Sequence, residues 1–129
     1  ERVTVLRTQY PHIEIRMGAP FNCISLAGTH CSAAQNKLLI SAKGEIFPCE
    51  AFKFLRGTRP TIYKHTLEDV WENDLLLNDI RKMLGQKDSC ANCEFSLLCR
   101  GGCHGQRLQA NGCLTGGFDP DCMRLHNVN

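Results

Sequence analysis

Four cysteines fall within the fourteen residues from Cys90 to Cys103, with the spacing C-x2-C-x5-C-x3-C, and two glycines precede the last of them. A packed hydrophobic core does not require sulfur at this density. Structural zinc and iron–sulfur clusters do, because several thiolates must converge on one centre. The run therefore indicates a metal site, and the glycines favour a tight turn just before Cys103.

The chain as a whole is rich in cysteine, with nine in 129 residues. Because nine is odd, complete pairing in disulfides would leave one cysteine over. The chain does not open with the charged and apolar regions of a signal peptide, and no apolar run is long enough to span a membrane. We therefore expect reduced thiols, a cytoplasmic location and no membrane partner. The formal charge of +2, without a basic stripe, also argues against nucleic-acid binding.

Two kinds of element are predicted to position the cysteines. Residues 37–42 and 45–47 read as two strands around Lys43-Gly44, where glycine can supply a positive φ in a hairpin turn. Thr66 and Asp69 have the spacing of a capping box, and apolar residues continue at helical spacing to residue 84, with Gly85 as the C-terminal cap. A break at residues 73–74 allows one bent helix or two short ones. Trp71 and the leucines of this segment are predicted to pack against the hairpin.

The two ends of the chain carry weaker patterns. Residues 1–22 are predicted to be extended, because Val3 and Val5 alternate with polar neighbours, as do two later isoleucines. Residues 103–110 favour a short helix closed by Asn111-Gly112, and a last helical turn is predicted from Pro120 with Asp119 as its cap. The expected fold is small α+β and metal-nucleated, with a β-hairpin, short helices and cluster-binding loops.

The order of the cysteines resembles that of the SPASM domain of radical S-adenosylmethionine enzymes. Further matching segments are Gly44-Glu-Ile-Phe-Pro-Cys49, Leu67-Glu-Asp-Val-Trp71, Cys99-Arg-Gly-Gly-Cys103 and Asp119-Pro-Asp-Cys122. The resemblance covers roughly residues 23–125. The best-known members of the family are anaerobic sulfatase-maturating enzymes and ribosomal-peptide maturases, in which the domain carries two auxiliary [4Fe–4S] clusters.

The resemblance implies a ligand set for each cluster. A run whose last cysteine serves a neighbouring cluster is known from two-cluster ferredoxins. Cys23 lies upstream of the signature, and without it the first cluster has an open iron site; Cys113 has no place in the pattern. The implied ligands are Cys23, Cys31, Cys49 and Cys103 for cluster I, and Cys90, Cys93, Cys99 and Cys122 for cluster II.

The resemblance also implies a role. Residues 1–22 would link to a radical S-adenosylmethionine barrel of the same parent chain, and residues 23–129 would form the SPASM domain. The barrel would bind S-adenosylmethionine, while the clusters relay electrons or engage a peptide or protein substrate. This sequence lacks the C-x3-C-x2-C motif of the catalytic cluster. We therefore assign no catalytic residue in it and leave open whether the chain by itself is an enzyme.

Two alternatives follow from the same residues. Taken alone, Cys90-x2-Cys93 is more typical of zinc, so two four-cysteine zinc sites are the main alternative to clusters, and zinc also enters thiolate sites readily in a recombinant sample. The chain would then be an independent metal module, either a zinc-stabilised interaction domain or a small electron carrier. His30 and His104 adjoin two of the cysteines, and we expect both to be surface or loop histidines.

Overall fold

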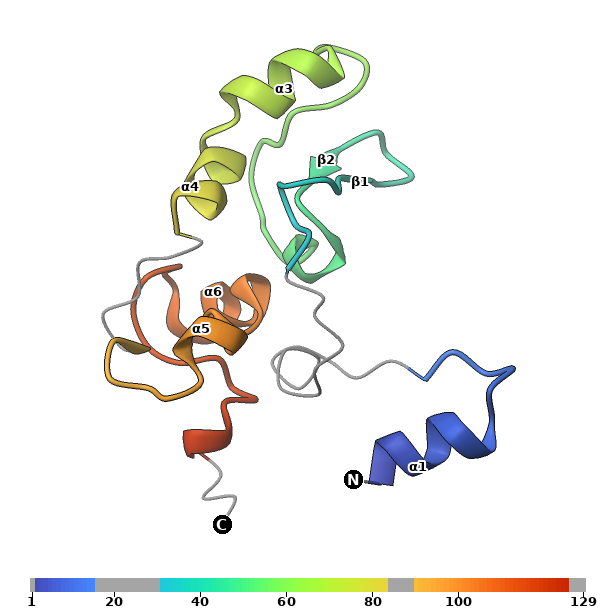
Figure 1. The fold of residues 1–129 in the computed structure, drawn as a ribbon. Helices are drawn as coiled ribbons and strands as arrows, with labels where there is room; N and C mark the ends of the chain where they lie inside the picture. Colours follow the sequence, from blue (N-terminus) through green and yellow to red (C-terminus); the bar gives the residue numbers. More distant parts are fainter. Residues whose placement is uncertain (1, 16–30, 84–89, 126–129) are drawn as a thin grey trace.

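The computed structural model describes residues 2–15, 31–83 and 90–125 (Figure 1). It confirms a small α+β fold, in which the hairpin and the α3–α4 pair lie side by side above α5 and α6. None of the helices in the described ranges is long and apolar enough to cross a membrane. The elements are α1 Arg2–Gln9, β1 Leu39–Ile40, β2 Ile46–Phe47, the 3-10 turn η1 Glu50–Phe52, α3 Leu67–Asn73, α4 Leu75–Met83, α5 Ser96–Cys99, α6 His104–Asn111 and the 3-10 turn η3 Met123–Leu125.

The predicted hairpin is present, although its strands are shorter than expected. β1 and β2 are antiparallel, with Leu39 opposite Phe47, and Gly44 has the positive φ of +77° that its turn requires. Residues 60–62 run along the other edge of β2, where the Ile46 N–H donates to the carbonyl of Pro60 at 2.8 Å. The sequence analysis did not predict this third segment, which provides β2 with a hydrogen-bonded neighbour on both sides.

Residues 67–83 form two short helices and not one bent helix, which were the two forms that the sequence allowed. The Thr66 hydroxyl accepts the Asp69 N–H at 3.1 Å, which confirms the predicted start of α3. Between the helices, the Asp74 carboxylate accepts the Leu77 N–H at 3.0 Å and so begins α4. The predicted end of the segment, at residues 84–85, lies outside the described residues.

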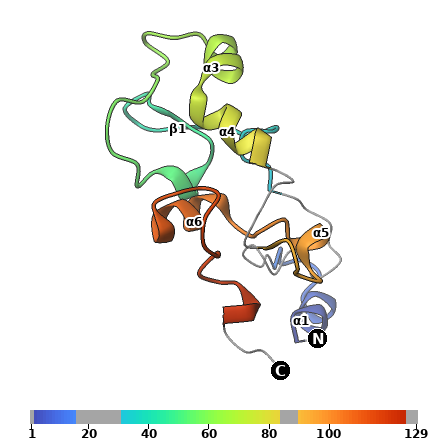
Figure 2. The ribbon, with the colours of Figure 1, turned by 90° about the vertical axis from the view of Figure 1, so that its left-hand side faces the viewer.

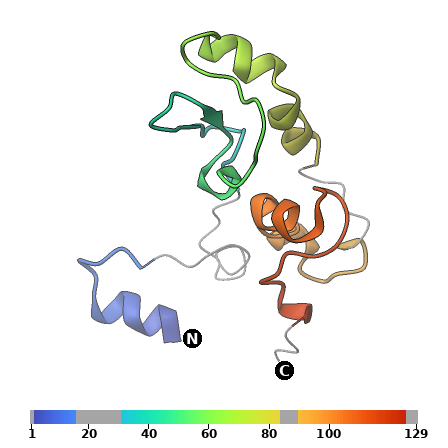
Figure 3. The ribbon, with the colours of Figure 1, turned by 180° about the vertical axis from the view of Figure 1, so that it is seen from behind.

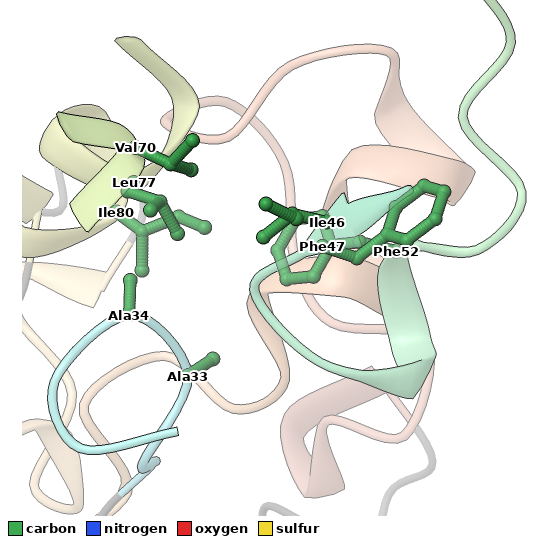
Figure 4. Close-up of a cluster of buried hydrophobic side chains, with 8 residues drawn as sticks. All are labelled: Ala33, Ala34, Ile46, Phe47, Phe52, Val70, Leu77 and Ile80. Atoms are coloured by element: carbon green, nitrogen blue, oxygen red, sulfur yellow. The ribbon is translucent and has the colours of Figure 1, made fainter. Parts of the chain in front are cut away.

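The hydrophobic core forms where the hairpin meets this helix pair (Figure 4). The prediction that all the leucines of the segment belong to it is wrong, because Leu67 and Leu75 are 49% and 80% exposed. Leu75 is two residues from Leu77, and side chains two apart do not share a helix face. The core residues are Ala33, Ala34, Ile46, Phe47, Phe52, Val70, Leu77 and Ile80.

The prediction of an extended N-terminal segment is wrong for Arg2–Gln9, which form α1. No residue of α1 is buried, and Figures 1 and 3 show the helix apart from the other described elements. A lone strand leaves its backbone groups unpaired, whereas a helix satisfies them within the segment. The alternation of a few apolar residues does not outweigh this difference.

The predicted helix after Cys103 is confirmed as α6, and its C-terminal cap Gly112 has a φ of +71°. Figures 2 and 3 show that α6 lies directly beneath the η1 turn. The two backbones approach so closely that a Cβ on Gly105 would lie 2.5 Å from the Cβ of Ala51. This contact brings the residues just before η1 and α6, which are Cys49 and Cys103, to the same place.

Candidate metal centres

One group of cysteines lines a cavity formed by residues of the segments 90–101 and 118–124. Local turns wrap the chain around it: the Cys93 N–H donates to the Cys90 carbonyl at 3.1 Å, and the Cys99 N–H donates to the Phe95 carbonyl at 2.7 Å. The side chains of Phe95 and Phe118 form an apolar part of the cavity wall. The cysteines that line this cavity, called the cavity group below, are Cys90, Cys93, Cys99 and Cys122.

The chain leaves this cavity through a left-handed turn. Arg100, Gly101 and Gly102 have φ values of +49°, +82° and +75° in succession. The prediction of a tight turn before Cys103 is therefore confirmed. Cys103 does not line the cavity, although Cys99 does.

A second group of cysteines forms at the contact between η1 and α6. Cys49 and Cys103 are the N-cap residues of these two elements, and each interacts electrostatically with Cys31. Cys49 and Cys103 also interact electrostatically with each other. Cys31, Cys49 and Cys103 are called the inner group below.

Burial has the largest effect on the pKa of two thiols of the inner group. It raises the pKa of both Cys49 and Cys103, and the neighbouring Cys31 raises each further. Backbone N–H groups oppose this shift and lower the pKa, that of Ala51 at Cys49 and those of Gln106 and Gly105 at Cys103. A bound cationic centre would reverse the balance, because it stabilises the thiolates.

The described cysteines do not converge on a single-ion site. The eight described cysteines form no disulfide with one another. Within the described ranges, no three His, Cys, Asp or Glu side chains are close enough together to hold one metal ion. A tetrahedral zinc with Zn–S bonds of about 2.3 Å requires sulfurs only about 3.8 Å apart. Thiolates spaced around a cavity suit an iron–sulfur cluster better, because each thiolate binds a different iron atom and the sulfurs therefore lie farther apart.

Two cysteines are assigned to neither group. Cys23 falls in residues 16–30, which are outside the described residues, so its role as a fourth ligand stays a prediction. Cys113 is exposed and does not line the cavity.

Asp119 connects the two groups. Its carboxylate is buried, lines the cavity, and accepts the backbone N–H groups of Cys103 and of Asp121, the latter at 2.8 Å. Burial raises the pKa of Asp119, while these two N–H groups lower it. The sequence predicted Asp119 only as the cap of a helical turn that starts at Pro120. The 3-10 turn begins instead at Met123. Residues 119–121 form a separate turn, which the hydrogen bond from the Asp121 N–H to the Asp119 carboxylate holds.

Arg107 and Asn111 hold the loop that precedes Asp119. Arg107 is fully buried, and its Nη2 donates to the carbonyls of Thr115 at 2.9 Å and Gly117 at 2.7 Å. The Asn111 Nδ2 donates to the Phe118 carbonyl at 2.9 Å. Sequence reasoning missed both residues. The available signal was the glycine-rich loop at 115–117, whose carbonyls need donors from elsewhere.

His104 corrects another prediction. It was expected at the surface or in a loop, but it lies in the first turn of α6 and is only 1% exposed. The close packing of α6 against η1 accounts for its burial, because the same turn of the helix contains Gly105.

Comparison with known proteins agrees with this architecture. Residues 31–94 match the SPASM family, described as an iron–sulfur cluster-binding domain. The PqqA peptide cyclase of Bradyrhizobium diazoefficiens is 29% identical over 85 residues, which are 64% of this chain and 22% of that protein. The PqqA peptide cyclase of Xanthomonas oryzae pv. oryzae is 29% identical over 86 residues, covering 66% of this chain and 23% of its own length.

Solved structures extend the similarity over more of the chain. SuiB of Streptococcus suis bound to S-adenosylmethionine superposes with a TM-score of 0.58 at 29% identity, covering 91% of this chain and 26% of SuiB. A structure of SuiB bound to the precursor peptide SuiA matches with the same TM-score and coverage. Residues 31–94 therefore match the SPASM domain, an iron–sulfur cluster-binding domain, and the chain is similar in sequence and fold to part of SuiB. It spans about a quarter of the length of these relatives.

Proposed function

We propose that this chain is the auxiliary-cluster domain of a radical S-adenosylmethionine enzyme that modifies a peptide or protein. The observation that carries the proposal is the separation of seven cysteines into an inner group and a cavity group. Two groups are what a domain with two clusters requires. The similarity to PqqA peptide cyclases and to SuiB, solved with a precursor peptide, supports a peptide substrate.

In this proposal the cysteines are ligands and not nucleophiles. The cavity group holds one [4Fe–4S] cluster, and the inner group holds another with Cys23 as its fourth ligand. When bound, such clusters supply one-electron transfer. Phe95 and Phe118 shield one of them from water, and the turn at residues 100–102 keeps the two sets of thiolates apart. The partner is a barrel of the same parent chain, which binds S-adenosylmethionine in a reducing, cytoplasmic compartment.

Metal content tests the proposal directly. Protein purified without oxygen should be brown and should contain about eight iron and eight sulfide per chain. Two tightly held zinc ions per chain in protein from its native host, with no iron, would overturn the proposal and favour a zinc-stabilised interaction domain.

The assignment of ligands has a sharper test in two neighbouring cysteines. Cys99 and Cys103 are only four positions apart, but Cys99→Ser and Cys103→Ser should alter different clusters, since only Cys99 lines the cavity. Cys103→Ser should give the same change in the electron paramagnetic resonance spectrum as Cys49→Ser, whereas Cys99→Ser should match Cys122→Ser. Cys113→Ser, at an exposed position, is the control and should change neither signal. Identical spectra for Cys99→Ser and Cys103→Ser would contradict the assignment.

A further inference from the structure

One buried residue, Asp119, accepts a backbone hydrogen bond from a cysteine of each group. One oxygen of Asp119, Oδ2, accepts the backbone N–H of Cys103, which belongs to the inner group. The other oxygen, Oδ1, accepts the Asp121 N–H in the turn that leads to Cys122 of the cavity group. The Asp119 carbonyl also accepts the Cys122 N–H at 2.9 Å. A single residue thus fixes the backbone of one cysteine from each group.

The surrounding residues hold this carboxylate in place. Gly102 leaves the space that it occupies, because a Cβ there would lie 2.1 Å from Asp119 Oδ2. On the other side, Arg107 and Asn111 hold the carbonyls of residues 115–118 immediately before Asp119. Movement of the carboxylate would therefore break its hydrogen bonds to the N–H groups of Cys103 and Asp121.

The position of the charge matters as well as its hydrogen bonds. Asp119 lines the cavity of the cavity group and interacts electrostatically with Cys103 of the inner group. An ionised carboxylate can only accept hydrogen bonds, as Asp119 does from two N–H groups. A fixed negative charge near a cluster lowers the reduction potential of the cluster. Groups behind the ligands commonly orient and tune metal centres in this way.

We propose that Asp119 is a positioning residue shared by the two centres, which fixes their ligands relative to each other and lowers the reduction potential of both. The inference rests on the proposed function, since it concerns clusters held by these two groups. It assigns Asp119 no contact with iron and no proton transfer.

The test compares Asp119→Asn with Asp121→Asn in the anaerobically purified protein. The asparagine at 119 keeps the size of the side chain but removes its charge and one acceptor. Both clusters should then show altered electron paramagnetic resonance signals, and both reduction potentials should rise. Asp121 is exposed and its carboxylate accepts only Gln106 Nε2 among the described side chains, at 3.2 Å, so Asp121→Asn should leave both potentials unchanged.

Each outcome bears on a different claim. A change in one cluster alone, or an Asp119→Asn protein that behaves like Asp121→Asn, would overturn the shared role while leaving the proposed function intact. Wild-type protein without iron would overturn both. If Asp119→Asn does not fold, Asp119→Glu keeps the charge but displaces it by one methylene. That variant should perturb both signals, and a perturbation confined to one centre would overturn the inference.

Discussion

At the scale of single residues, close approaches decide how the two cysteine groups are arranged. Gly102 is needed for the space taken by Asp119, and Gly105 is needed for the contact of α6 with Ala51. The sequence suggested that glycines before Cys103 would make a tight turn, and this was correct. It could not predict which side chain fills the space beside Gly102, because Asp119 lies far along the chain.

The role of Gly102 can be separated from its backbone conformation. Gly57 also has a positive φ, +104°, but no atom lies within 4 Å of where a Cβ would be. Gly57→Ala should therefore cost only the left-handed strain, about 1 kcal/mol. Gly102→Ala should cost several-fold more and should lower iron content, because the added methyl displaces Asp119. Thermal unfolding and iron analysis of both variants provide the measurement, and equal losses of stability would contradict the explanation.

Two thiols should differ in reactivity when the iron is removed. The thiolate is the reactive form, and burial raises the pKa of Cys49, so less of this thiol is ionised near pH 7.5. The exposed Cys113 should therefore react before Cys49 with iodoacetamide. Raising the pH increases the thiolate fraction, so labelling of Cys49 should accelerate steadily up to and above its ordinary pKa. Mass spectrometry at several pH values measures the order, and labelling of Cys49 before Cys113 would contradict it.

At the scale of elements, local signals were sufficient for the hairpin, the start of α3 and the end of α6. Each depends on neighbours in sequence, such as Gly44 in a turn or the Thr66 hydroxyl on the Asp69 N–H. The same reasoning failed for α1, where too few residues carried the alternation, and for residues 60–62, which pair with β2 across a long loop. Contacts between distant segments are not encoded in local periodicity, which explains these omissions.

The core face of α4 offers a matched comparison within one helix. Leu77 is completely buried, whereas Leu75 is 80% exposed. Leu77→Ala should lower the free energy of unfolding by about 3 kcal/mol, since it removes buried methylenes and leaves a cavity. Leu75→Ala should change it by less than about 0.5 kcal/mol. Chemical denaturation of both variants is the measurement, and similar midpoints would show that α4 packs through another face.

At the scale of the whole molecule, apolar and polar burial are divided between two regions. The buried hydrophobic side chains among the described residues all lie between Ala33 and Met83. In residues 90–125 the buried positions are instead glycines, His104, Arg107 and Asp119. Under the proposed function, we expect such a region, without an apolar core of its own, to depend on bound metal and on polar contacts for its order.

Removal of iron should therefore affect the two regions differently. After chelation, amide hydrogen exchange should increase strongly across residues 90–125, while residues 39–47 and 67–83 should stay protected by the hydrophobic core. Mass spectrometry of the exchanged protein resolves the two regions. Reloading with iron and sulfide is the control and should restore protection. Loss of protection throughout the chain at the same chelator concentration would show that the core does not fold without the clusters.

The contact of α6 with η1 also has a consequence for protein synthesis. It draws the inner group from three widely separated parts of the chain, whereas the cavity group begins at Cys90 and ends at Cys122. A ribosome nevertheless releases Cys103 before Cys122. The thiols of the long-range group are thus all present while the short-range group still lacks its last member. Asp119 is released between these two moments, so the carboxylate that binds the Cys103 N–H is present before the cavity group is complete.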